Sequence, residues 1–397
     1  MVNVPAPAPA PAPAPATAPA PATAPAPATA PIAVEPDRPL TDSGRPPSRG
    51  RGLRGRRLSP GQFGVITLIG AWALASTIVS GGAVRLTGSG LGCSTWPRCT
   101  TTQVVAPWQY HAWVEFGNRL ITTLVSLVAV AAVVGALARV PRRRDLTWLS
   151  IGLVGGIVAE IVLGGLTVLS KLAPGFVMAH FLLAVVFLAD AMILHHRAGI
   201  PDEPDPKRPG RARAVRPTQP LVSSGCIRLA RLLLMAAAGV VCLGTVVTST
   251  GPHGGDPKAH RFTFSLHDVA QLHGTSVEIF LALTLLTLWA LSRNHAPESV
   301  MRRGEILLLV LVIQGGIGYL QYFNGDPTAV VGLHLAGATA LVVAVLHFNL
   351  GLYARPVATL YARPAATNDT RPAVATPHAR PAVATHDARP AIPVPQP

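Results

Sequence analysis

The sequence predicts an all-α membrane protein with eight transmembrane helices, arranged as two tandem four-helix bundles between disordered Pro/Ala-rich ends. Three observations support this fold class. Of 397 residues, 49% are hydrophobic and only 13% are charged, whereas soluble domains carry about 25% charged residues. The hydrophobic residues gather into eight runs, each long enough to cross a hydrocarbon core of about 30 Å. The two halves of the chain also resemble each other.

The eight hydrophobic runs are separated by connections that alternate in charge. They lie near residues 62–82, 110–138, 145–168, 175–196, 226–250, 266–292, 303–323 and 328–351. Basic residues gather before the first run and in the even-numbered connections, as in "RVPRRRD" (139–145). This positive-inside pattern predicts that both termini are cytoplasmic and that the odd-numbered connections lie outside a plasma membrane. The net charge of +15 therefore reflects topology, and we expect no nucleic-acid binding.

The composition of the ends and of the central connection divides the chain into parts. Residues 1–58 and 354–397 are rich in Pro, Ala and Thr and cannot bury enough apolar surface to fold. We predict that they are disordered cytoplasmic segments. Residues 198–224 are predicted to be a cytoplasmic linker, extended and solvated. Between these parts lie two predicted four-helix units, 59–197 and 225–353.

An internal repeat relates the two units. "GGLTVLSKLAPGFVMAHFLLA" (164–184) resembles "GGIGYLQYFNGDPTAVVGLHLAGA" (315–338), and an offset of 154 residues carries His180 onto His334. Nearly the same offset carries Asn118 onto His273. Counted from the outer ends of their helices at about 1.5 Å per residue, these four positions lie roughly 8–12 Å deep. The four side chains are therefore expected at one level of the membrane.

Histidines at equal depth on facing helices can bind one haem iron from opposite sides. His273 and His334 form a complete candidate pair in the second unit. In the first unit His180 has Asn118 opposite it, and an amide is a poor iron ligand. We therefore expect a closed, six-coordinate haem in the second unit and a haem with one open side in the first.

Glu115 distinguishes the first unit, because the equivalent position in the second is near Ala270. It shares a helix face with Asn118, three residues away. A buried carboxylate is suited to proton transfer, which makes Glu115 the candidate catalytic residue. The alternative is a structural i,i+4 pair between Glu115 and Arg119, and the sequence leaves both interpretations open.

The first outer connection, "VRLTGSGLGCSTWPRCT" (84–100), contains two cysteines. Cys93 and Cys99 lie on the predicted oxidising side, where a nearby pair forms a disulfide. A structural role and a redox role for this pair both stay open. Arg85, at the outer end of the first helix, is placed to reach a haem propionate.

Six features in order, the cysteine pair and the motifs "VRLTGSGLGC", "EFGNR", "AHFLLA", "QLHGTS" and "GLHLAGA", together resemble the haem A synthase family over about residues 60–352. The resemblance implies oxidation of a methyl group of haem O to the formyl group of haem A by successive hydroxylations, for haem–copper oxidase biogenesis. It implies haem b on His273 and His334, and a substrate haem in the first unit. Many members have "E-x-x-H-R" where this chain has Glu115, Asn118 and Arg119, so the chain departs from the pattern at residue 118.

The resemblance also implies partners within the lipid bilayer. A haem farnesyltransferase that supplies haem O and terminal oxidase assembly factors are candidates, and homo-oligomer formation stays open. Two rival functions remain. A non-catalytic membrane cytochrome b that relays electrons would carry ligands in both units and no isolated acid. A parallel-repeat transporter would need broken, polar segments in the odd-numbered helices, where Glu160 is the acid near the midplane.

Overall fold

The computed structural model describes residues 57–215 and 220–354. The predicted disordered ends, 1–58 and 354–397, lie outside the described residues except at their inner edges. Residues 216–219 of the predicted linker also lie outside them.

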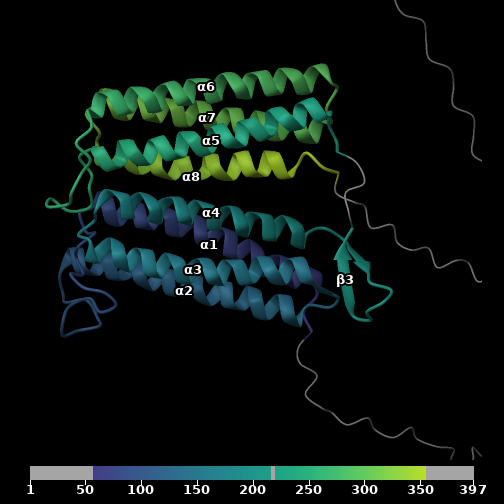
Figure 1. The fold of residues 1–397 in the computed structure, drawn as a ribbon, viewed down its shortest axis with the longest axis horizontal. Coiled ribbons are helices and arrows are strands. Elements are labelled where there is room, and N and C mark those ends of the chain that lie inside the picture. Colours follow the sequence, from purple (N-terminus) through teal and green to yellow (C-terminus); the bar gives the residue numbers. More distant parts are fainter. Residues whose placement is uncertain (1–56, 216–219, 355–397) are drawn as a thin grey trace, which may run out of the picture. The chain divides into compact units, whose positions relative to one another are not determined.

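Eight long helices make up most of this part of the chain, as predicted (Figure 1). Each is long and apolar enough to cross a membrane. Their bounds extend beyond the hydrophobic runs by up to about one turn, because polar residues such as Glu298 continue the helix outside the hydrocarbon. The helices are α1 Pro60–Leu86, α2 Tyr110–Ala138, α3 Arg144–Leu169, α4 Pro174–Ala198, α5 Ser224–Thr250, α6 Leu266–Arg293, α7 Glu298–Phe323 and α8 Thr328–Leu350.

Local capping chemistry sets where several helices begin. At α1, the Ser59 hydroxyl accepts a hydrogen bond from the Gln62 amide, and the Gln62 side chain accepts one from the Ser59 amide. This reciprocal pair satisfies two backbone donors that the first turn leaves unbonded. Ser223 and Ser265 accept equivalent bonds at α5 and α6. Prolines are the first residues of α1 and α4. Proline is tolerated there because the first amide of a helix has no hydrogen-bond partner within the helix.

The helices pack as two groups of four, as predicted. Helices α1 to α4 form one closed ring, in which each helix contacts the next and α4 returns to α1. Helices α5 to α8 form a second ring of the same kind. Helices α1 and α4 join the two rings by packing against α5 and α8 (Figure 1). A small apolar cluster at this junction contains Ile78, Leu188, Val342 and Leu346.

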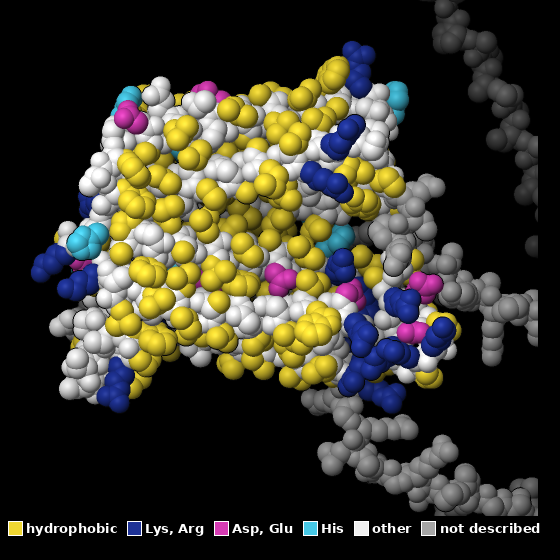
Figure 2. Space-filling view, viewed as in Figure 1, with side chains coloured by type: hydrophobic (Ala, Val, Ile, Leu, Met, Phe, Trp, Pro, Cys, Tyr) yellow, Lys and Arg dark blue, Asp and Glu magenta, His cyan; other side chains and the backbone are white. Residues whose placement is uncertain are grey.

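The outer surface of the helices is apolar, as expected for a multi-pass membrane protein. Figure 2 shows hydrophobic side chains spread over the flank of the helices, with Lys and Arg side chains gathered most densely near the small sheet. Large exposed hydrophobic side chains of the helices include Trp72, Leu124, Trp148 and Leu309. Such side chains are stable in contact with lipid, which does not penalise exposed apolar surface.

A three-stranded sheet closes one end of the first unit and differs from the sequence prediction. Its strands are β1 Arg142–Arg143, β2 Asp202–Pro204 and β3 Arg211–Ala214, in the order β1-β3-β2. β3 pairs parallel to β1 and antiparallel to β2. The linker was expected to be an extended, solvated tether, but this segment is held in the sheet by backbone pairing. The expectation fails because composition alone does not reveal long-range pairing.

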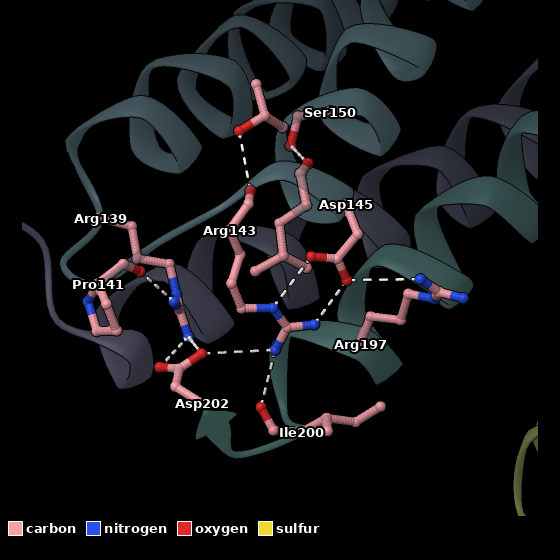
Figure 3. Close-up of polar contacts among 10 residues, drawn as sticks. Arg139, Pro141, Arg143, Asp145, Ser150, Arg197, Ile200 and Asp202 are labelled. Atoms are coloured by element: carbon pink, nitrogen blue, oxygen red, sulfur yellow. Dashed lines mark hydrogen bonds and ion pairs between the residues drawn. The ribbon is translucent and has the colours of Figure 1, made fainter. Parts of the chain in front are cut away.

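Two buried arginines anchor this sheet to the helix ends (Figure 3). The Arg139 guanidinium lies 2.9 Å from the Asp202 carboxylate, and the Arg143 guanidinium lies 2.7 Å from that of Asp145 and 3.6 Å from that of Asp202. The two arginine side chains are 1% and 0% exposed. Buried charges require such partners. Part of the basic charge that the sequence assigns to topology therefore also has a structural role.

Candidate functional site

The second unit brings its predicted histidine pair together. His273 lies on α6 and His334 on α8, two helices on opposite sides of the second ring. The centroids of their imidazole rings are 6.5 Å apart, and the ring planes are inclined by 77°. Two imidazoles bound to one metal at about 2.0–2.1 Å place their ring centroids roughly 6 Å apart. The observed separation therefore fits a single iron held between the two rings.

Each imidazole of this pair lies against a glycine of the preceding helix. A Cβ atom at Gly244 of α5 would lie 3.2 Å from Cε1 of His273, and one at Gly318 of α7 would lie 3.0 Å from Cε1 of His334. Any larger residue would push the rings away from their present positions. The Nδ1 atoms of both histidines are buried and make no hydrogen bond within the described ranges. A buried nitrogen of this kind is open to a partner that the described residues do not supply.

A large cavity surrounds this histidine pair. Its volume is about 750 Å³, and both histidines line it. This volume lies within the range of about 300–1,000 Å³ that is typical of ligand and cofactor pockets. The walls are mostly apolar and come from α5 to α8, together with residues of α1 and α4 such as Ile78 and Phe181. An apolar plate with a central metal, such as a haem, fits these walls and these two ligands.

Arg85 connects the first unit to this cavity. It lies near the outer end of α1 and lines the cavity of the second unit. Its guanidinium donates hydrogen bonds to the carbonyls of Thr248 at 2.5 Å and His253 at 2.6 Å. The sequence predicts that Arg85 contacts a haem propionate but does not indicate whether that haem belongs to the first or the second unit. The structure places Arg85 beside the cavity of the histidine pair.

The first unit arranges its equivalent positions differently. The Ser80 hydroxyl of α1 donates a hydrogen bond of 2.8 Å to Oδ1 of Asn118. Nδ1 of His180 is in direct contact with the carboxylate of Glu160 on α3. Neither Asn118 nor His180 lines the 750 Å³ cavity. The polar partners of these two residues therefore come from within the first unit.

Glu115 is buried and fully engaged. Its carboxylate lies 2.6 Å from the Arg119 guanidinium and accepts a hydrogen bond of 2.7 Å from the backbone amide of Cys93. Arg119 also donates to the carbonyls of Thr95 and Pro97 in the outer loop. The i,i+4 pair that the sequence left as an alternative is therefore present. The catalytic role of Glu115 stays a prediction.

The outer loop above Glu115 contains the expected disulfide. Cys93 and Cys99 are bonded to each other and are fully buried. They pack with Ala106 and Ala112 in a small apolar cluster. The Cys93 amide that bonds Glu115 belongs to one of these cysteines, so the disulfide and the buried acid form one connected group.

Two features of the candidate sites were not singled out from the sequence. The sequence presents Glu160 only as a midplane acid compatible with a transporter, and its glycine pattern does not show that Gly164, Gly244 and Gly318 lie against histidine rings. A Cβ atom at Gly164 of α3 would lie 3.3 Å from Cε1 of His180, so glycines support three histidines in the same manner. The repeat offset of 154 residues carries Gly164 onto Gly318 and could have revealed this pattern.

Sequence comparisons relate the chain to proteins of one kind. The sequence model of the COX15-CtaA family, described as cytochrome oxidase assembly protein, matches residues 102–252. A protein of Symbiobacterium thermophilum named "Heme A synthase" is 27% identical over 275 residues, which cover 65% of this chain and 86% of that protein.

Shorter alignments relate the chain to other proteins of the same name. The protein of Geobacillus kaustophilus is 30% identical over 113 residues, and that of Geobacillus thermodenitrificans is 31% identical over 114 residues. Each of these two alignments covers 28% of this chain and spans only 35% of the relative's length. Over these parts of its length the chain is similar to proteins named haem A synthase and to the COX15-CtaA family of cytochrome oxidase assembly proteins.

Proposed function

We propose that this protein is a membrane-bound oxidoreductase that converts haem O to haem A. The reaction oxidises one methyl group of the porphyrin to a formyl group by successive hydroxylations. The names of the similar proteins support this activity, as does the presence of two unlike histidine sites in one chain. Haem O would come from a haem farnesyltransferase, and haem A would pass to the assembly of a haem–copper oxidase.

The observation that carries the proposal is the difference between equivalent positions of the two units. In the second unit, His273 and His334 lie 6.5 Å apart between ring centroids, so both axial positions of an iron can be filled. In the first unit, His180 is matched by Asn118, whose carbonyl oxygen accepts a hydrogen bond from Ser80. Sites that transfer electrons fill both axial positions, whereas sites that react keep one open. The first unit is therefore assigned to the substrate and the second to a resident haem.

The resident group of the second unit is assigned as haem b. His273 and His334 would hold its iron, and the apolar walls of the cavity would hold its ring. Arg85 lines the cavity near its outer end and would face a propionate. When bound, this haem supplies one-electron transfer to and from the substrate site. The protein contributes the fixed spacing of the two ligands and a pocket with mostly apolar walls.

Glu115 is assigned as the acid–base group of the substrate site. It lies three residues before Asn118, or about 4.5 Å along the helix axis, on the same face. Its carboxylate is held in place by Arg119 and by the Cys93 amide. A carboxylate fixed at this level can accept a proton as the methyl group is oxidised. The same contacts would hold the outer loop over the substrate haem.

The proposed topology follows from the charge distribution. The plasma membrane is assigned as the location, with both termini in the cytoplasm. The basic end that carries β1 to β3 would then be cytoplasmic, and the Cys93–Cys99 loop would lie on the opposite, oxidising side. The disulfide is consistent with this orientation.

Analysis of the extractable haems tests the proposal. The full-length protein is purified from a host that makes haem O, and its haems are separated by chromatography and identified by mass. Haem b together with haem O or haem A is the expected result. Haem b alone would support a cytochrome that only relays electrons and would overturn the assignment. A His180→Ala variant serves as the control, because it should lose haem O and haem A while retaining haem b.

A further inference from the structure

A buried carboxylate in the first unit contacts the candidate substrate ligand. Glu160 lies on α3, and its carboxylate is in direct contact with Nδ1 of His180 on α4. The Glu160 side chain is only 13% exposed. Acids at this depth in a membrane protein are unfavourable unless they serve a partner or a function. His180 is the partner that the structure provides.

Glu160 and Gly164 together fix the position of the His180 ring. They lie four residues apart on α3 and therefore share one helix face. Gly164 leaves room for the ring edge, because a Cβ atom there would lie 3.3 Å from Cε1 of His180 and 3.5 Å from Nε2. Nδ1 lies against the Glu160 carboxylate, so the nitrogen left for a metal is Nε2. One helix thus determines both where the ring lies and which nitrogen is available.

The second unit has an amide where the first has this acid. The offset of 154 residues that carries His180 onto His334 and Gly164 onto Gly318 carries Glu160 onto Gln314. Gln314 is buried, and its side-chain amide donates a hydrogen bond of 2.8 Å to the backbone carbonyl of His334. The aligned positions therefore carry a charged side chain that contacts the imidazole in the first unit and a neutral one of nearly equal size that contacts the histidine backbone in the second.

A carboxylate behind a metal-bound histidine changes the chemistry of the metal. Metal-binding histidines commonly donate their second ring N–H to a carboxylate or carbonyl, which fixes the tautomer and raises the basicity of the bound nitrogen. A more basic ligand stabilises the oxidised iron and lowers its reduction potential. A neutral amide has a weaker effect, because hydrogen bonds to charged acceptors are roughly twice as strong.

We propose that Glu160 is a positioning residue that holds His180 through Nδ1 and directs Nε2 to the iron. The Glu160 carboxylate then makes the first-unit haem harder to reduce than a glutamine at the same position would. The inference rests on the proposed assignment of a haem to His180. It explains why a substrate site that must be oxidised and a site that only transfers electrons differ at this position. The pair Glu160 and His180 supplies no proton to the substrate, which distinguishes its role from that of Glu115.

Reciprocal substitutions test this role in the haem-loaded, full-length protein. Glu160→Gln gives the first unit the glutamine found at the aligned position of the second unit. Gln314→Glu gives the second unit the glutamate found in the first. The midpoint potentials of both haems are measured by spectroelectrochemical titration, and the ferrous Fe–His stretch of the first-unit haem by resonance Raman spectroscopy. We expect Glu160→Gln to raise the first-unit potential and lower the stretching frequency, without changing the second-unit haem. Gln314→Glu should lower the second-unit potential, and Glu160→Asp should restore part of the wild-type values.

Asp190 provides a matched control for loss of a buried acid. It lies ten residues along α4 from His180, about 15 Å along the axis, and its Oδ2 atom is buried without a hydrogen bond in the described part of the chain. Asp190→Asn should leave the Raman frequency unchanged. An equal change in Asp190→Asn and Glu160→Gln would overturn the proposal, because it would indicate a general charge effect.

The remaining outcomes also decide the question. Unchanged potential and frequency in Glu160→Gln, with the first-unit haem still bound, would overturn the role of Glu160 alone. If Glu160→Gln does not fold or load haem, Gln314→Glu decides: a lowered second-unit potential supports the inference, and an unchanged one overturns it. A wild-type protein without a first-unit haem would instead overturn the proposed function together with this inference.

Discussion

The two four-helix units are similar in how they position histidines and different in what surrounds them. In both units a histidine of the last helix lies against a glycine of the helix before it, at Gly164 and at Gly318. The second unit adds His273 to complete a pair, whereas the first has Asn118, bonded to Ser80. The first unit also carries the acids Glu115 and Glu160, which the second replaces with neutral residues near Ala270 and at Gln314.

This comparison indicates how a duplicated scaffold can acquire two functions. The shared glycines and helix depths set where an iron can be held, and they require no charged group. Glu115, Glu160 and the disulfide loop are found in the first unit, where the chemistry is proposed to occur. The second unit has mostly apolar walls and two histidine ligands, which suit a haem that is held permanently. Experiments that exchange or remove these features can therefore separate binding from reaction.

Loss of either ligand of the second unit should have the largest effect. We expect His273→Ala and His334→Ala each to abolish the low-spin, six-coordinate haem spectrum, because the remaining imidazole can fill only one axial position. Absorption and magnetic circular dichroism spectra of the purified variants provide the measurement. His195→Ala is the control, since His195 contacts Thr67 far from the pair, and its spectrum should be unchanged. Retention of the low-spin spectrum in both ligand variants would contradict the assignment.

Removal of the Glu115 charge should affect the reaction and not haem binding. Loss of a general acid–base group reduces rates by about 10²–10⁴-fold, so Glu115→Gln should load haem in both units and form almost no haem A. Haem O or a hydroxylated intermediate should accumulate in the extracted haems. Glu305→Gln, an exposed acid on α7, is the matched control. A near-normal yield of haem A would show that Glu115 serves only to bind Arg119 and the outer loop.

Removal of the disulfide tests a feature that the first unit has and the second unit lacks in the described ranges. Loss of a bridge that closes so short a loop should destabilise the protein by about 2 kcal/mol, measured as a lower thermal unfolding temperature in detergent. The Cys93→Ala/Cys99→Ala variant should still fold, because the apolar cluster and the Arg119 contacts remain. If its turnover equals that of the wild type, the disulfide has a structural role and no part in electron transfer. The Cys242→Ala variant, at an exposed free cysteine, is the control.

Substitution of the glycines beside the histidines should give the smallest effects. Gly318→Ala places a Cβ atom 3.0 Å from the His334 ring, and Gly164→Ala places one 3.3 Å from the His180 ring. Crowding of this kind destabilises by about 1 kcal/mol or somewhat more, which should weaken haem retention about fivefold. Gly315→Ala on the same helix as Gly318 is the matched control, since a Cβ atom there meets nothing within 4 Å. Equal haem loss in Gly315→Ala and Gly318→Ala would contradict the proposal that Gly318 positions the His334 ring.

Much of the fold and part of the site can be predicted from the sequence. Hydropathy identifies all eight helices, because a membrane span must be long and apolar wherever it lies. The repeat offset identifies His273 and His334, because equal depth on facing helices follows from their spacing. Contacts between distant segments cannot be predicted in this way. The pairing of "RR", "DEP" and "RARA" in one sheet, the bonds of Arg85 to the second unit and the contact of Glu160 with His180 all depend on packing.

Electron paramagnetic resonance of the oxidised protein tests the central claim most directly. We predict two haem signals in the wild type, one low-spin from the His273–His334 pair and one high-spin from the site of His180 and Asn118. Asn118→His should convert the high-spin signal into a second low-spin signal, because it completes the pair as in the second unit. Two low-spin signals in the wild type, or a high-spin signal that Asn118→His leaves unchanged, would contradict the account of one closed and one open site.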